Sequence, residues 1–263
     1  MSHRRLAWPA ASALALILAG CALGETPATG TRSPPSGGQS PAASVPVPAA
    51  SGSPDAAATD EAVIERFFAL ASDEALTFRV TSDGSIDSRV GGERGVITVT
   101  SDMAVRGRDA VGDFVLASGG EEQAFELLIV DETGYARTAE GWEPIPEFRQ
   151  DQPVNPFVLL SGPGDLEYVE RARVDGEEFH RLRSRVWLGG DVASLEQEGW
   201  ENPEIEESRF DVLVREDGTP SRAQFTGTLT GTYNGEAAEV SFDFTYIFTE
   251  VGEPVEIPDP AGG

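Results

Sequence analysis

The chain has 263 residues, a formal net charge of −26 and a single cysteine. Its 45 acidic residues against 19 basic ones argue against a nucleic-acid-binding protein, because such proteins need a basic surface. The same charge opposes lying flat on an anionic membrane surface. One cysteine excludes a disulfide within a single copy of the chain.

Residues 1–20 predict a secretory signal peptide, with a basic start, an apolar run over 6–18 and small residues after it. Leu18-Ala19-Gly20 followed by Cys21 resembles the lipobox of bacterial lipoproteins. The resemblance implies that Cys21 becomes the first mature residue and carries acyl chains such as palmitate. A transmembrane anchor is disfavoured, because the run is shorter than about 20 residues and contains Pro9. The alternative is an ordinary signal peptide, which would leave a lone thiol on an exported protein.

Residues 21–58 predict a disordered tether that begins with the lipidated Cys21. Proline, alanine, serine and glycine dominate this segment, and it contains no aromatic residue. Such a sequence cannot bury enough apolar surface to offset the entropy of ordering its chain. It would hold the rest of the chain at the outer face of the cytoplasmic membrane; a recognition segment for a proline-binding partner is the alternative.

Residues 59–260 predict one folded domain that opens with a helix over 60–75, capped by Thr59. Apolar residues recur there at helical spacing, so one face of the helix must pack against another element. They are Val63, Ile64, Phe67, Phe68 and Ala71.

After the helix, the apolar period changes to two, which is typical of β-strands. Strands are predicted over 76–80, 95–100, 110–117, 123–130, 135–137, 166–174, 178–188, 208–215, 221–233 and 238–248. A Gly-rich connection joins the first two. Short helical turns are predicted at 155–161, inserting against the sheet, and at 191–199. Most strands follow one another through tight turns, such as Asn234-Gly235, so the sheet is antiparallel.

This order allows either a two-sheet sandwich or a single curved sheet closing over its own helices. The apolar helix at 60–75 favours the second, because it needs a concave partner. Val240, Phe242, Phe244, Tyr246 and Phe248 share one face of the last strand and could supply that partner. The predicted fold is therefore mainly β (α+β): a curved antiparallel half-barrel enclosing the N-terminal helix and one or two short helices.

Three local segments, together with the order of elements, resemble the LolA-like half-barrel family. The segments lie at 134–142 (Gly-Tyr-Ala-Arg, then Gly-Trp), at 214–220 and at 251–260. Lipid-anchored members of that family include the LppX/LprG group of actinobacterial lipoproteins. The resemblance covers 59–260 and implies a carrier that shields lipid tails or lipidated proteins while they cross the cell envelope.

The predicted function is thus an extracytoplasmic, lipid-anchored lipoprotein that binds acyl chains for transport or sorting. We expect a monomer with no cofactor, a lipid or lipidated ligand, and an envelope transporter as a candidate partner. The predicted ligand-contact residues are Phe67, Phe68, Phe125, Leu127, Phe225, Phe242, Phe244 and Tyr246. The competing interpretations are that these residues form an ordinary packed core, and that the protein is an envelope scaffold.

The sequence offers little catalytic chemistry, so no enzyme is predicted. A Ser-His-Asp triad would have to use His180, which stands among apolar strand residues and is interpreted as a core or rim histidine. The predicted mature chain has one histidine and no second cysteine, which does not suit a zinc site. Paired carboxylates for glycoside hydrolysis stay open, because 45 acids offer too many pairs. Arg181, Arg183 and Arg185 predict a solvent-facing stripe paired with acids; the alternative is a grip on an anionic headgroup.

Overall fold

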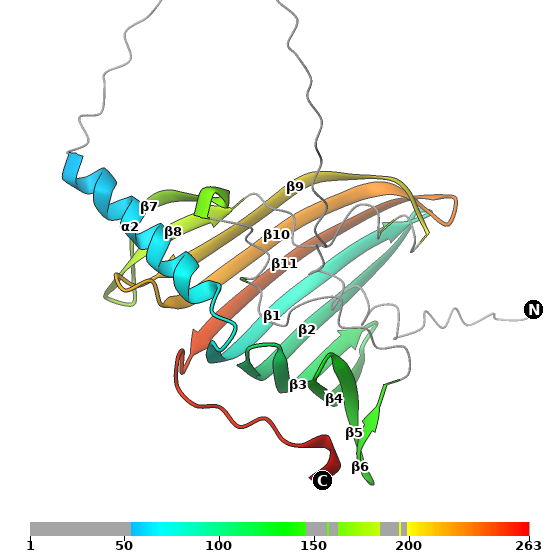
Figure 1. Cartoon of the computed structure of the whole chain (residues 1–263). Helices are drawn as coiled ribbons and strands as arrows, with labels where there is room; N and C mark the ends of the chain where they lie inside the picture. Colours follow the sequence, from blue (N-terminus) through cyan, green and yellow to red (C-terminus); the bar gives the residue numbers. More distant parts are fainter. Residues whose placement is uncertain (1–53, 146–156, 158–162, 185–194, 196–198, 263) are drawn as a thin grey trace, which may run out of the picture.

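The computed structural model describes residues 54–145, 157, 163–184, 195 and 199–262 (Figure 1). Its elements are α2 (Pro54–Ala71), β1 (Thr77–Val90), β2 (Glu93–Arg106), β3 (Asp109–Ser118), β4 (Glu121–Val130), β5 (Thr133–Thr138), β6 (Gly141–Pro144), η3 (Pro163–Asp165), β7 (Leu166–Val174), β8 (Glu177–Ser184), β9 (Trp200–Val214), β10 (Pro220–Tyr233), β11 (Glu236–Thr249) and η4 (Pro260–Gly262).

All described strands belong to one 11-stranded sheet, in the order β6-β5-β4-β3-β2-β1-β11-β10-β9-β8-β7. Every neighbouring pair is antiparallel. The sheet curves and stays open, and α2 lies against one of its faces at the β7 side (Figure 1). The predicted mainly β fold, a curved half-barrel sheet with an N-terminal helix, is confirmed. Of the two predicted short helical segments, only Phe157, Leu195 and Gly199 lie among the described residues.

Helix α2 begins at Pro54 and ends at Ala71, so the predicted bounds of 60 and 75 are wrong, as is the cap at Thr59. Proline suits the first helical position because its φ is already helical, and three alanines that favour helix follow at 56–58. The helix ends early because Asp73 forms a local turn. Its Oδ1 accepts a hydrogen bond from the Ala75 amide at 2.9 Å, which replaces a further helical turn.

The predicted Gly-rich connection between the first two strands is wrong. Strand β1 continues to Val90, and it pairs with β2 without a break from Thr77↔Arg106 to Val90↔Glu93. Residues 82–88 are mostly serine, glycine and aspartate, which individually disfavour strands. Pairing with β2 on one side and β11 on the other overrides that preference. The turn then falls at Gly91-Gly92, both at positive φ.

Strand β9 also begins earlier than the sequence predicts, at Trp200 instead of residue 208. Its first half contains Pro203 and four glutamates, which disfavour a strand in isolation. The pairing with β10 accommodates them through register shifts between Thr228 and Leu229 and between Thr230 and Thr232. Such bulges let a strand carry a proline that cannot donate to the ladder.

The core between α2 and the sheet is an aromatic cluster centred on Phe157, which is 1% exposed. Its ring centroid lies 5.2 Å from that of Phe67 on α2 and 4.8 Å from that of Phe248 on β11. Phe78 and Phe210 lie 6.3 and 6.4 Å away. Phe157 belongs to the segment that the sequence predicts to insert against the sheet. Its burial agrees with that prediction.

The turn between β9 and β10 makes a close backbone contact with α2. Gly218 has φ +88°, and a Cβ at this position would lie 2.7 Å from both the Arg66 carbonyl carbon and the Phe67 amide nitrogen. The adjacent Glu216 carboxylate lies 3.4 Å from the Arg66 guanidinium. Only glycine allows this turn to approach the helix so closely.

We expect Gly218→Ala to destabilise the protein more than Gly235→Ala. Both glycines have a positive φ, +88° and +83°, so both substitutions carry the conformational cost of about 1–2 kcal/mol. Gly235, however, has open space where a Cβ would stand, whereas Gly218 faces the backbone of α2. Urea unfolding of the two variants measures the difference. If both variants lost the same free energy of unfolding, the contact between Gly218 and α2 would contribute nothing to stability.

Candidate functional site

The face of the sheet that packs against α2, here called the inner face, carries the candidate ligand-contact residues. In β11, Ala238, Val240, Phe244 and Phe248 are buried, whereas the alternating Glu239, Asp243, Ile247 and Thr249 are exposed. The predicted one-sided aromatic stripe of the last strand is therefore confirmed. This alternation assigns every inward position along the central strands.

The eight predicted contact residues divide between two separate apolar clusters. Phe67, Phe225 and Phe244 are buried in the larger cluster, and Phe68, Phe242 and Tyr246 pack against it half-buried. Leu127 is buried in a smaller cluster with Phe114 and Ile129, and Phe125 packs against it. The structure therefore brings six of the eight residues together in one apolar cluster and sets two apart on β4. Their role as ligand contacts stays a prediction.

The part of the inner face nearest α2 is filled by the protein itself. Phe67, Phe78, Phe157 and Phe210 are all fully buried there. Sequence reasoning did not include Phe78, Phe157 or Phe210 among the contact residues. The alternating pattern of β1 and β9 could have indicated Phe78 and Phe210, but no pattern marks Phe157 as the centre. This part of the inner face is an ordinary packed core.

Apolar side chains with accessible surface lie further along the inner face. Phe242 and Tyr246 on β11 are half-buried, as are Ile97 on β2 and Leu116 on β3. These four residues are here called the half-buried patch. Tyr246 has short neighbours in register, Ser82 and Ala223, and Gly227 stands opposite Phe242 on β10. On the other side of Phe242, the buried Ile86 on β1 stands between it and Ile97.

Next to this patch, a glycine on β1 makes room for the buried ring of Phe244. The Phe244 ring covers Gly84 on β1 so closely that a Cβ there would lie 2.2 Å from the ring. The rings of Phe242 and Tyr246 stack on those of the buried Phe225 and Phe244 and are themselves only half-buried. The half-buried patch is thus the part of the inner face best able to contact an apolar ligand.

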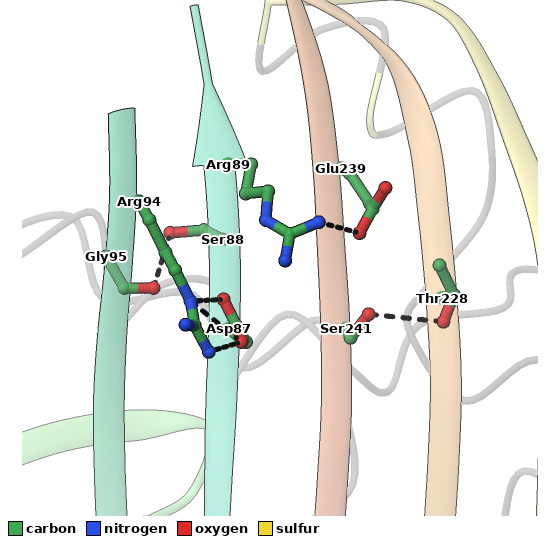
Figure 2. Close-up of polar contacts among 8 residues, drawn as sticks. All are labelled: Asp87, Ser88, Arg89, Arg94, Gly95, Thr228, Glu239 and Ser241. Atoms are coloured by element: carbon green, nitrogen blue, oxygen red, sulfur yellow. Dashed lines mark hydrogen bonds and ion pairs between the residues drawn. The ribbon is translucent and has the colours of Figure 1, made fainter. Parts of the chain in front are cut away.

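The opposite, outer face is polar over the central strands that Figure 2 shows. Arg94 forms an ion pair with Asp87, and Arg89 Nη1 lies 3.4 Å from Glu239 Oε1. Thr228 and Ser241 place their hydroxyl oxygens 3.3 Å apart on neighbouring strands. Such exposed pairs contribute little stability individually. They do, however, make this part of the outer face unsuited to an apolar ligand.

His180 is a buried histidine whose two ring nitrogens both have partners. Nε2 lies 2.8 Å from Glu216 Oε2, and Nδ1 lies 3.2 Å from the Tyr168 hydroxyl. Burial, with a smaller contribution from Asp60, raises the pKa of Tyr168, so the phenol keeps its proton and can donate it to Nδ1. Either Nδ1 accepts from the phenol while Nε2–H donates to Glu216, or both ring nitrogens donate and the phenol and the carboxylate accept. Neither nitrogen is then available to activate a serine, and His180 fits the predicted core or rim histidine.

The arginine stripe on β8 is paired with acids, as the sequence predicts. Arg181 Nη1 lies 2.8 Å from Glu170 Oε1, and Arg183 Nε lies 2.7 Å from Asp211 Oδ1. A second bond from Arg183 makes that pair bidentate, and Arg209 adds a further ion pair to Asp211. Arg185 lies outside the described residues. Arg181 and Arg183 are therefore engaged by the protein's own carboxylates.

No cluster of three or more histidine, cysteine, aspartate or glutamate side chains suited to a metal ion occurs in the described ranges. In the same ranges, none of the helices has the length and apolar character needed to span a bilayer.

No protein-family model and no curated protein sequence matches the chain. Among solved structures it is similar to LprF from Mycobacterium bovis, with a TM-score of 0.43, 12% identity and coverage of 77% of this chain and 97% of that one. It is also similar to a putative outer membrane lipoprotein-sorting protein domain from Vibrio parahaemolyticus, with a TM-score of 0.27, 10% identity and coverage of 72% and 92%. The MucA/MucB complex of Pseudomonas aeruginosa gives a TM-score of 0.29, 14% identity and coverage of 77% and 61%.

Each of these TM-scores lies below 0.5, so the likenesses do not assign a family or a ligand to this chain. What this chain binds has to be judged from its own inner face.

We expect Asp211→Asn to destabilise the protein at neutral pH and to do so less in acid. Burial by itself raises the pKa of Asp211, but hydrogen bonds from Arg183 and Arg209 outweigh it and hold this pKa below its usual range. The carboxylate therefore contributes stability above about pH 4, and this contribution is lost as the pH falls through the lowered pKa. Urea unfolding between pH 7 and pH 3 should show that the difference in free energy of unfolding between the native protein and the variant becomes smaller as the pH falls.

Glu239→Gln is the matched control, because it removes an exposed ion pair on the same face. It should change the free energy of unfolding by less than about 0.5 kcal/mol. A gap for Asp211→Asn that stays constant down to pH 3 would contradict the assignment of this carboxylate as the charged centre of the network.

Proposed function

We propose that this chain is an extracytoplasmic lipoprotein that binds and shields lipid acyl chains for transport or sorting in the cell envelope. The observation that carries the proposal is the half-buried patch of Phe242, Tyr246, Ile97 and Leu116. It continues the buried aromatic core along the inner face of an open, curved sheet. An acyl chain lying on this patch would extend the core with its own methylenes.

The energetics of such a site are adequate for specific binding. Each methylene removed from water contributes about 0.8 kcal/mol. Ten methylenes would thus supply about 8 kcal/mol, which corresponds to a dissociation constant of about 1 μM before the cost of ordering the ligand. A single C16 chain reaches that range without any charged contact. This suits an inner face whose described residues are mainly apolar.

The N-terminal segments complete the proposal. Cys21, acylated, would anchor the chain to the outer face of the cytoplasmic membrane, and residues 22–58 would connect the anchor to the folded part. Anchoring through acyl chains is compatible with a net charge of −26, which would oppose direct adsorption to anionic lipid. The site then needs no catalytic group, and an envelope transporter that receives the lipid is a fitting partner.

A non-catalytic envelope scaffold is the second candidate, and the fully buried aromatic core around Phe157 favours it. Such a protein needs an apolar docking surface on its exterior. In the described part of the chain, the exposed large hydrophobic residues are Val96 and Ile247, 40% and 46% exposed. They lie six residues apart in register along the outer face, so they do not form one patch. This observation supports the lipid-binding proposal over the scaffold.

The direct test is native mass spectrometry of the full chain carrying Cys21→Ser, which removes the expected acylation site, purified from a lipid-containing host. We expect a stoichiometric lipid adduct that survives gentle desolvation. A preparation that carries no lipid, and that binds no added palmitate, would reject the proposal.

We expect Phe242→Ala in the same background to weaken palmitate binding about tenfold. The substitution removes part of the apolar contact surface, worth about 1–2 kcal/mol. Ile247→Ala is the matched control, because Ile247 lies on the same strand, faces outward and is 46% exposed. Equilibrium dialysis measures both affinities, and urea unfolding verifies that both variants are folded. Equal affinities for the two variants would show that the patch does not contact the ligand.

A further inference from the structure

A pair of serine hydroxyls lies on the apolar inner face. Ser82 on β1 and Ser101 on β2 stand directly opposite each other in register, and their hydroxyl oxygens are 2.7 Å apart. Ser101 is only 8% exposed, and Ser82 is half-buried. Their inward direction follows from the buried Val80 and Val99, two residues away on the same strands. Buried polar groups in an apolar surface need an explanation, because leaving them unpaired is costly.

The pair has one more hydrogen-bond donor than it uses. Two hydroxyls supply two hydrogens, and the Ser82–Ser101 bond takes one of them. In the part of the chain that the structure describes, neither hydroxyl makes another hydrogen bond. The second hydrogen is therefore left to donate to a group other than the side chains and backbone of the described residues.

The serine pair lies between apolar side chains on both sides. Along the row that crosses the sheet, Tyr246 flanks Ser82 and Phe114 flanks Ser101. Tyr246 belongs to the rim of the larger apolar cluster, whereas Phe114 belongs to the smaller one. The serine pair thus forms a polar interruption where the two apolar clusters meet.

We propose that the Ser82–Ser101 pair donates a hydrogen bond to the carbonyl or carboxyl oxygen of an acyl ligand. The inner face then distinguishes acyl compounds from plain hydrocarbons of equal length. The free hydroxyl hydrogen points to an acceptor, and the apolar clusters on both sides accommodate the hydrocarbon. This inference rests on the proposed lipid-binding function and names its ligand class. A free fatty acid and an esterified lipid both carry the required oxygen.

The test compares three C16 probes, palmitate, methyl palmitate and hexadecane, delivered from cyclodextrin to the full chain carrying Cys21→Ser. In this background, we expect the double variant Ser82→Ala/Ser101→Ala to bind palmitate and methyl palmitate about fivefold more weakly, and hexadecane with unchanged affinity. One neutral hydrogen bond accounts for a change of that size. A loss for palmitate alone would identify the free carboxylate as the acceptor; a loss for both would identify the shared carbonyl oxygen.

Two further variants control the result. Thr228→Val/Ser241→Ala removes a comparable hydroxyl pair from the outer face and should leave all three affinities unchanged. Ser82→Thr retains the hydroxyl and should retain the preference for acyl probes, and urea unfolding of each variant verifies folding. The hydrogen-bond proposal would be overturned if the Ser82→Ala/Ser101→Ala variant bound all three probes as tightly as the Cys21→Ser parent. An equal loss of affinity for all three probes would also overturn it. Either result would leave the lipid-binding proposal intact. Failure of every probe to bind the Cys21→Ser parent would overturn both.

Discussion

The pairing of β1 with β11 holds the two halves of the molecule in one sheet. Strands β2 to β6 extend from one side of this pair, and β10 to β7 extend from the other. The ladder runs from Arg79↔Thr249 to Val90↔Ala238, so strands from the beginning and the end of the domain meet at its centre. Without that ladder the chain would form two separate sheets, and the inner face would lose its continuity. Long-range pairing of this kind carries a high loop-closure cost that only a shared core can offset.

Gly84 is the residue that makes this central ladder compatible with an aromatic inner face. It stands opposite Phe244 in register, and the ring occupies the space that any side chain at this position would need. A glycine in a strand usually weakens it, because it is flexible and packs nothing. Here the ring of the neighbouring strand supplies the missing packing. This contact adds to the pairing with β2 and β11 that keeps residues 82–88, mostly serine, glycine and aspartate, in the central strand.

The sequence was sufficient to predict the helix, the antiparallel meander and the one-sided stripe of β11, because each has a clear apolar period. It could not predict that β1 continues to Val90 or that β9 begins at Trp200, because both extensions depend on partners distant in the chain. The candidate contact residues were predicted from apolar character alone. Apolar character alone does not distinguish Phe67, which is fully buried, from Phe242, which is half-buried. That distinction requires the position of Phe157, which no periodic pattern marks.

The way α2 is held suggests how the inner face keeps its shape. Gly218 brings the β9–β10 turn against the helix backbone, and Glu216 of the same turn contacts both Arg66 on α2 and His180 on β8. Glu216 is largely exposed, so the Arg66 pair alone contributes little. The buried His180, satisfied on both ring nitrogens, fixes the carboxylate in place and makes the contact directional. The helix is thereby fixed at one end of the sheet, where Phe67 and Phe157 complete the core. The half-buried patch lies beyond that filled end, so the proposed binding of an acyl chain does not require the helix to move.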